Sequence, residues 1–218
     1  MKYMVIDTES SGLFDFKRPA DADGQPRLAE LALVLLDENF EVESSMNLYI
    51  RPDGWEMQDT ATAINGLTNE MLAEKGISIE VALHAYAAAI DEGRAVIAHN
   101  AQFDCKMVRG ELRRAGMDDM FERTPNICTM RSLLAHAKQT GRQLIKYDAA
   151  GNPTNAKGWP KLSDGLRYYD LPQPEKAHGA LDDALATAAL IKAMVADGFD
   201  PTPEVHHSAN YEAIKDAK

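Results

Sequence analysis

The sequence predicts an α/β fold in which a mixed central sheet of about five strands is flanked by helices. Three strand-like segments come first, and two of them read as a hairpin, which indicates antiparallel neighbours. Short apolar segments then alternate with longer amphipathic ones, which is typical of parallel strands joined by helices. With 218 residues, the chain is long enough to bury one substantial core, so one domain with elaborations is expected.

The first half of the sheet follows from apolar patterning. Alternating side chains over residues 2–9 predict the first strand. Residues 14–27 are rich in Pro, Asp and Gly and predict a loop. The almost unbroken apolar run over 28–37 (LAELALVLLD) is typical of a strand buried on both faces. Alternation over 41–50 predicts the partner of that strand in a hairpin.

The remaining elements are helices separated by short buried strands. Residues 95–99 and 126–128 are short apolar segments and predict strands. The helices are expected where apolar residues recur at helical spacing between capping or breaking residues, with Ser78 as one N-cap. Their expected ranges are 59–63, 69–74, 79–91, 103–115, 130–138, 161–169 and 181–196.

Two segments fall outside this regular pattern. Residues 140–160 are rich in turn-forming residues and are expected to form an excursion from the main fold. The end of the chain is polar, and polar termini are usually loosely held. We therefore expect a folded domain over residues 1–198 and a polar C-terminal tail over residues 199–218.

The charges of the chain are unevenly distributed. The chain has 23 Lys and Arg against 34 Asp and Glu, a net charge of −11, whereas proteins that grip many phosphates are expected to be basic. Residues 94–176 nevertheless contain 14 basic and 9 acidic side chains, which leaves 9 basic and 25 acidic elsewhere. A basic middle could guide a polyanion if the fold gathers it on one side. A set of solvated helix faces is the alternative, which charge alone favours.

Composition also bears on the compartment. No apolar run approaches the roughly 20 residues that span a bilayer. The N-terminus turns acidic at Asp7, too early for a secretory signal. Cys105 and Cys128 are the two cysteines and cannot form a disulfide framework. A reduced, cytoplasmic protein is therefore expected.

Four acidic residues stand where predicted elements begin or end. Asp7 and Glu9 close the first strand and, being two residues apart, project from the same face. Placing two like charges together is costly, which points to a divalent cation, although a strand end that faces water has the same pattern. Asp104 opens a helix after a buried strand, where it could equally stabilise the helix N-terminus. Asp183 shares a helical stripe with apolar residues, which favours a paired or metal-bound acid.

One histidine stands just before the last helix. The ordinary pKa of histidine, near 6.5, suits proton transfer at neutral pH, so His178 could act as a general base. Taken alone, His178 is more simply interpreted as a residue of a surface loop.

Three motifs in order resemble those of a known family. They are Asp7-x-Glu9, the segment HNAQFD over residues 99–104 and the segment HGALDD over residues 178–183. Together they resemble the motifs of the DEDDh 3′–5′ exonucleases, relatives of the proofreading subunit of bacterial replicative polymerase with a ribonuclease H-like fold. The segment AINGLTNE over residues 63–70 also resembles the corresponding segment of that family. The resemblance runs from about residue 2 to residue 196.

The resemblance implies metal-dependent hydrolysis of phosphodiesters from the 3′ end of single-stranded DNA. Asp7, Glu9, Asp104 and Asp183 are implied as catalytic metal ligands for two Mg²⁺ ions, which Mn²⁺ could replace. His178 is implied as the general base. A nucleic-acid strand with a free 3′ end is implied as the substrate, and a DNA polymerase as a further partner. The implied substrate-binding residues are Thr8, Glu9, Leu13, Asn65, Phe103 and His178.

Several alternatives stay open at this point. Leu13, Phe14 and Phe16 could stack on the last bases or pack under the loop. Asn65 stands where relatives often have His, so contacts from that position are open. An exoribonuclease of the same family is an alternative function, and a non-catalytic nucleic-acid-binding module is an alternative of another class. The basic side chains of the 140–160 excursion and its flank could follow the strand electrostatically. They are Arg142, Lys146, Lys157 and Lys161.

Overall fold

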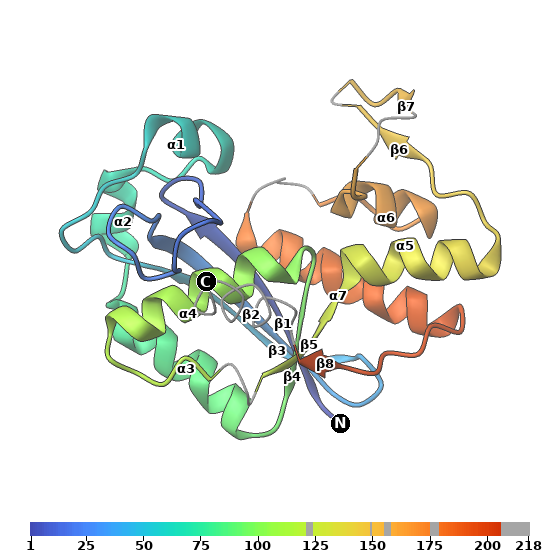
Figure 1. Ribbon diagram of the computed structural model, residues 1–218, viewed down its shortest axis with the longest axis horizontal. Coiled ribbons are helices and arrows are strands. Elements are labelled where there is room, and N and C mark those ends of the chain that lie inside the picture. Colours follow the sequence, from blue (N-terminus) through green and yellow to red (C-terminus); the bar gives the residue numbers. More distant parts are fainter. Residues whose placement is uncertain (121–123, 149, 155–157, 175–178, 206–218) are drawn as a thin grey trace.

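A mixed sheet forms the centre of the computed structural model, which describes residues 1–120, 124–148, 150–154, 158–174 and 179–205. The strands follow the order β3 (Val42–Tyr49), β2 (Leu28–Leu36), β1 (Tyr3–Ser10), β4 (Ala95–Ala98), β5 (Pro125–Cys128) and β8 (Glu204–Val205). β2 is antiparallel to both β1 and β3, whereas β4 is parallel to β1 and β5 is parallel to β4 (Figure 1). The prediction of a mixed sheet is confirmed.

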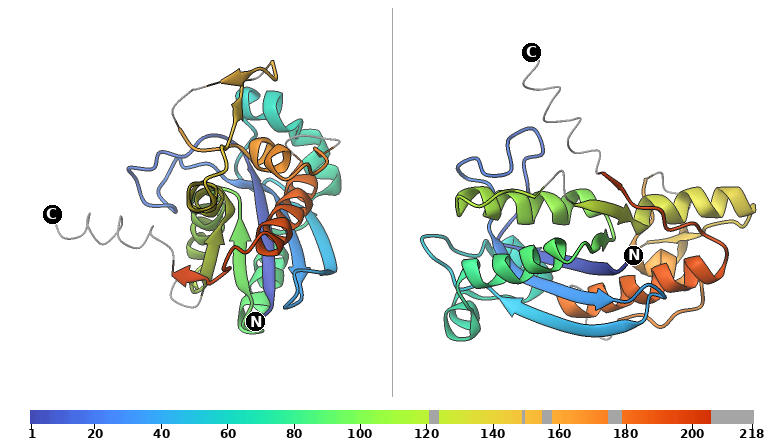
Figure 2. Two further views of the ribbon diagram at one scale, coloured as in Figure 1. Left: turned by 90° about the vertical axis from the view of Figure 1, so that its right-hand side faces the viewer. Right: turned by 90° about the horizontal axis from the view of Figure 1, so that it is seen from below.

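Helices cover both faces of this sheet. They are α1 (Asp59–Asn65), α2 (Asn69–Lys75), α3 (Ile79–Asp91), α4 (Ala101–Arg114), α5 (Thr129–Thr140), α6 (Leu162–Tyr168) and α7 (Ala180–Ala196). The largest core lies between the sheet and α3 and α4, and a second core lies between the sheet and α7 (Figure 2). Each helix lies within a few residues of its predicted range. Among the described residues, no helix is both long enough and apolar enough to cross a membrane.

The alternation of side chains along β1 decides where the acidic residues point. Ile6 belongs to the core shared with α3 and α4, whereas Val5 belongs to the core shared with α7. Because residues two apart on a strand share a face, Asp7 and Glu9 lie on the α7 side and Thr8 lies on the α4 side. One strand therefore sends acids toward α7 and a hydroxyl group toward α4.

The loop over residues 14–27 is present as predicted and is fastened along α4. Gln25 is buried, and its Nε2 donates a hydrogen bond to the Pro19 carbonyl oxygen at 2.9 Å. Lys106 of α4 donates from Nζ to the Arg18 carbonyl oxygen at 2.8 Å. These bonds fix the position of the loop beside the end of β1.

Close packing of α4 against this loop gives a first testable prediction. A Cβ added at Gly110 would lie 2.7 Å from the backbone oxygen of Ala20, so the loop would have to move. We expect Gly110→Ala to lower the free energy of unfolding by about 1–3 kcal/mol, which is typical of overpacking. Urea denaturation measures the change, and an unchanged midpoint would contradict the close approach.

Two short pairings were not expected from the sequence. The 140–160 excursion contains a small antiparallel hairpin of β6 (Lys146–Tyr147) and β7 (Pro153–Thr154). β8 pairs with β5, where the sequence suggested only polar tail. Strands of two residues show no apolar periodicity, so the patterning could not reveal them. Residues 206–218 of the expected tail lie outside the described residues.

Candidate active site

Three predicted acids meet at one end of the sheet. Asp7 and Glu9 of β1 and Asp183 of α7 each offer a carboxylate oxygen, and these oxygens lie within 4.8 Å of one another. All three residues are half-buried. Asp183 lies in the first turn of α7, and the residues of its stripe, Thr187 among them, are buried as predicted. We call these three residues the acidic cluster.

Asp104 approaches the same place from the α4 side of β1. It lies in the first turn of α4 and is only 3% exposed. Its Oδ1 accepts hydrogen bonds from the backbone nitrogen of Thr8 at 3.0 Å and from Thr8 Oγ1 at 2.8 Å. Its charge contributes to a higher pKa for Asp7, so the two carboxyl groups are close enough to interact. The predicted four acids are therefore gathered around the end of β1.

The environment of these acids raises their pKa values. The pKa of Asp7 lies well above its ordinary value, first because of burial and then because of the neighbouring carboxylates. Burial raises the pKa of Glu9 to about 7, although a hydrogen bond from Asn65 opposes the shift. Burial also raises the pKa of Asp104 to about 7, against the bonds from Thr8. Ionising all of these groups together is costly unless positive charge offsets it.

The donor atoms fit a divalent metal ion. All are carboxylate oxygens, which are the ligands that Mg²⁺ and Mn²⁺ prefer, whereas zinc favours nitrogen and sulfur. A divalent cation would also offset the cost of keeping these buried, neighbouring acids ionised. The residues present therefore fit the metal that the resemblance implies.

This electrostatic strain predicts an unusual dependence of stability on pH. We expect the metal-free protein to lose stability as pH rises from about 5 to about 7. A carboxyl group with a raised pKa binds more protons in the folded than in the unfolded state between its two pKa values, so unfolding becomes easier as pH rises. For Glu9 that window runs from 4.5 to about 7.

Thermal melting with a chelator present tests this expectation. The melting temperature should fall by several degrees across the window, since about 1 kcal/mol corresponds to about 2–4 °C in a domain of this size. Added Mn²⁺ should flatten the fall because it binds the ionised acids of the folded state. A metal-free melting temperature that rises over the same pH range would show that the acids are not strained.

A fifth carboxylate adjoins the cluster and was missed in the sequence. Glu30 of β2 lies opposite Glu9 in the antiparallel pairing and is 3% exposed. Its Oε1 accepts a hydrogen bond from Asn47 Nδ2 at 2.8 Å, and its Oε2 accepts one from the backbone nitrogen of Ala180 at 3.4 Å. Glu30 thus links β3 and β2 to the first residue of α7. The available signal was a single charge inside an otherwise apolar run.

Glu30 is expected to position the acidic cluster by holding the start of α7. Glu30→Ala should weaken Mn²⁺ binding by about 10- to 100-fold, the usual cost of removing a residue that orients metal ligands. Titration calorimetry with Mn²⁺ measures the effect. Glu38→Gln, which alters an exposed acid in the turn after β2, is the matched control. Equal affinity of Glu30→Ala and the unaltered protein would exclude the positioning role.

A pocket of about 160 Å³ opens beside Glu9. Five of the six predicted substrate-binding residues line it, namely Thr8, Glu9, Leu13, Asn65 and Phe103. Leu13 is 84% exposed at the rim, and Ile64 of α1 is exposed as well. The buried Asn65 is held in place, since its Nδ2 donates to the Ser10 carbonyl oxygen at 3.3 Å. The pocket is therefore apolar at its rim and polar near the cluster.

The three apolar residues of the loop have different environments. Phe14 is buried in the core and meets Phe103 edge-on, with 5.5 Å between ring centroids. Phe16 is half-exposed beside the same ring, at 6.5 Å. Phe14 therefore packs under the loop, whereas the exposed Leu13 is free to contact a ligand in the pocket.

The motifs contain two histidines, His99 and His178, of which the structure describes only His99. His178, the expected general base, lies outside the described residues. His99 is largely buried, with Nδ1 3.0 Å from Thr129 Oγ1 and Nε2 3.1 Å from the Pro160 carbonyl oxygen. Burial lowers the pKa of His99 to about 4, so its ring is neutral at neutral pH. His99 joins the end of β4 to the segment that precedes α6.

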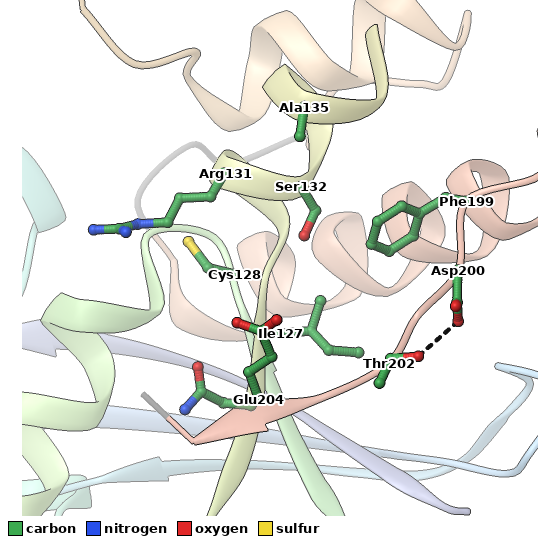
Figure 3. A pocket seen from close by; sticks show the side chains of 10 residues that line it. Ile127, Cys128, Arg131, Ser132, Ala135, Phe199, Asp200, Thr202 and Glu204 are labelled. Carbon is green, nitrogen blue, oxygen red and sulfur yellow. Dashed lines mark hydrogen bonds between the residues drawn. The ribbon is translucent and has the colours of Figure 1, made fainter. Parts of the chain in front are cut away.

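A second pocket, of about 330 Å³, lies between β5, α5 and the segment that leads to β8 (Figure 3). Its lining residues are Asn126, Ile127, Cys128, Arg131, Ser132, Ala135, Phe199, Asp200, Thr202 and Glu204. None of the predicted site residues is among them. The predicted site thus corresponds to the pocket beside Glu9 and to the acidic cluster.

Solved structures with a similar fold are nucleases. E. coli Exonuclease I, solved in complex with a dA16 oligonucleotide, is 19% identical with a TM-score of 0.68 over 89% of this chain and 41% of that one. Exonuclease I from Methylocaldum szegediense is 21% identical with a TM-score of 0.72 over 90% and 41%. Cell-death related nuclease 4 (CRN-4) is 16% identical with a TM-score of 0.71 over 93% and 66%. This chain thus spans about two fifths of the length of the Exonuclease I chains.

The sequence itself also matches a family. A search of curated proteins gave no match. The model of the RNase_T family, described as Exonuclease, matches residues 4–191, which is most of the chain. This match covers all three motifs on which the resemblance was based, and it confirms that resemblance. The chain belongs to the exonuclease family.

Proposed function

We propose that this protein is a 3′–5′ exonuclease that removes nucleotides from the 3′ end of single-stranded DNA with the help of two Mg²⁺ ions. The observation that carries the proposal is the convergence of Asp7, Glu9 and Asp183 from distant parts of the chain. The family match over residues 4–191 supports it and also supports an exonuclease domain over 1–198.

The acids would hold the metal ions. Asp7, Glu9, Asp104 and Asp183 are the proposed ligands, and Mn²⁺ should be able to replace Mg²⁺ in such an oxygen site. When bound, two divalent cations lower the pKa of an attacking water and neutralise charge on the phosphodiester and the leaving oxygen. The bonds from Thr8 fix the orientation of Asp104 before metal arrives.

The remaining proposed roles concern the substrate and the proton. The pocket beside Glu9 would receive the 3′-terminal nucleoside, with the exposed Leu13 against its base. Asn65 and Phe103 line the inner side of the same pocket. His178, which directly precedes Gly179 and α7, would take the proton from the attacking water as the general base.

Single-stranded DNA is proposed as the substrate because a protein of similar fold has been solved in complex with DNA oligonucleotides. E. coli Exonuclease I was solved with dA16 and, in another structure, with dT13.

Cys105 and Cys128 are both free thiols, which supports a reducing compartment such as the cytoplasm. The DNA polymerase that the resemblance implies as a partner remains a prediction.

One assay tests the proposed function directly. The purified protein is incubated with 5′-labelled DNA and RNA single strands, with Mg²⁺ or with a chelator, beside the Asp183→Asn variant. We expect the DNA strand to shorten by single nucleotides in Mg²⁺ alone, and only with the unaltered protein. Shortening of RNA but not DNA would identify an exoribonuclease instead. Binding without any shortening would identify a non-catalytic binding module.

A further inference from the structure

A hairpin that stands away from the sheet and a short helix, α6, that packs against α5 and α7 together form what we call the arm. The arm consists of residues 142–148, 150–154 and 158–168, which include β6, β7 and α6 (Figures 1 and 2). Asp164 is buried and holds it together. Its Oδ1 accepts a hydrogen bond from the backbone nitrogen of Tyr147 at 3.0 Å, and its Oδ2 accepts one from that of Lys161 at 2.9 Å. The arm is thus a packed structure with internal bonds.

The base of the arm lies near the carboxyl ends of β1 and β4, where the acids are gathered. The Pro160 carbonyl oxygen lies 3.1 Å from His99 Nε2. His99 comes two residues after Ile97, which pairs in parallel with Val5, and Asp7 comes two residues after Val5. Because adjacent parallel strands terminate at the same end of the sheet, the contact with His99 holds Pro160 near the acidic cluster. In Figure 1 the arm and α1 lie on opposite sides of this end of the sheet.

The arm presents two aromatic rings, each paired with an arginine. Trp159 is 53% exposed, and the guanidinium carbon of Arg131 lies 5.4 Å from its ring centroid. Figure 3 shows that Arg131 lines one side of the pocket drawn there and extends away from Phe199. Farther along the arm, the guanidinium of exposed Arg167 lies 4.5 Å from the ring of Tyr147. Both of these belong to a pocket of about 320 Å³ that Arg142 also lines.

We propose that this arm binds the nucleotides that precede the 3′-terminal one, with Trp159 and Tyr147 stacking on bases and Arg131 and Arg167 contacting phosphates. The inference rests on the proposed function, since it assumes that the strand passes over the acidic cluster. Aromatic rings that stack on bases, combined with guanidinium groups, are the usual means of gripping a single strand without reading its sequence.

The charge distribution agrees with this placement. The arm and Arg131 lie within residues 94–176, the stretch with 14 basic and 9 acidic residues in an otherwise acidic chain. The pocket beside Glu9 is lined by residues of α1, and the arm lies on the opposite side from α1 in Figure 1. We infer that a strand with its last nucleoside in this pocket passes the acids toward the arm.

Binding of short and long strands separates the arm from the catalytic end. Fluorescence polarisation with labelled (dT)3 and (dT)12 is measured in Ca²⁺, which slows hydrolysis. We expect Trp159→Ala and Tyr147→Ala each to weaken binding of (dT)12 by about tenfold or more, and binding of (dT)3 by less than about twofold. Trp159→Phe, which keeps a stacking ring, should restore most of the affinity for (dT)12.

Salt dependence tests the arginines. Removing one phosphate contact on a single strand should reduce the slope of log K against log salt by about 0.7. We expect that change from Arg131→Gln and from Arg167→Gln. Lys138→Gln is the matched control, because Lys138 is an exposed cation on α5, the same helix as Arg131, but lies seven residues farther along it, in the last turn.

Two results would overturn the inference. One is unaltered (dT)12 affinity in both alanine variants. The other is an equal loss for (dT)3 and (dT)12, which would mean that the rings act no farther along the strand than its last three nucleotides. Hydrolysis by the unaltered protein is scored separately. A protein that cleaves strands while the arm variants bind normally refutes the arm alone. A protein that binds through the arm but cleaves nothing refutes the proposed function alone.

Discussion

Asp7→Asn is expected to weaken Mn²⁺ binding by at least about 100-fold, because even residues that merely orient a metal ligand are worth about 10- to 100-fold. Strand shortening should fall with the bound metal. The same variant should melt at a higher temperature than the unaltered protein when both are free of metal. Four neighbouring carboxylates raise the pKa of Asp7, and an amide in its place removes that repulsion.

Calorimetric titration with Mn²⁺ and thermal melting with a chelator measure the two effects. Asp182→Asn is the control, because Asp182 neighbours Asp183 on α7 but is not part of the acidic cluster. A loss of thermal stability in metal-free Asp7→Asn would mean that Asp7 supports the fold through contacts other than metal. Unchanged Mn²⁺ affinity would remove Asp7 from the ligand set.

His178→Ala is expected to lower kcat by about 10²- to 10⁴-fold while leaving Mn²⁺ affinity and fold unchanged, as is usual when a positioned general base is lost. The rate of the unaltered protein should rise with pH as the imidazole loses its proton, near pH 6.5 for an ordinary histidine. That rise should disappear in the variant.

Single-turnover rates between pH 5.5 and 8.5 test both statements. His84→Ala serves as the control, since His84 is an exposed histidine on α3 whose Nδ1 lies 2.6 Å from the Glu80 carbonyl oxygen of the same helix. Normal turnover in His178→Ala would exclude the general-base role, and loss of metal binding would assign His178 a structural role instead.

The main elements could be predicted because their signals are local. The run over residues 28–37 and the alternation along β1 depend only on neighbouring side chains, and both strands lie where expected. α4 begins at Ala101, two residues before its predicted start, because Asn100 adopts a left-handed backbone with a φ of 68°. β6 and β7 pair only with each other, in a small hairpin, and β8 pairs with the distant β5. A stretch of two residues is too short for its pattern to predict either pairing.

The site shows the same division between local and distant information. Asp7 and Glu9 could be predicted to share a face because strand geometry alone requires it. Glu30 could not, because its place opposite Glu9 depends on how β2 returns along β1 after the loop over 14–27. The bond from Thr8 to Asp104 likewise joins residues 96 positions apart. The motifs identify the acidic residues, whereas the residues that position them depend on tertiary packing.

Asp164 has a consequence for how this protein could change over time. Its two carboxylate oxygens hold Tyr147 and Lys161, so the stretch between them leaves and rejoins the body at nearly one point. An insertion whose ends are pinned together can be lengthened or trimmed with little entropic cost elsewhere. If the arm binds the strand as proposed, grip on long substrates and cleavage of the terminal bond would be separable traits, open to independent adjustment by evolution or by engineering.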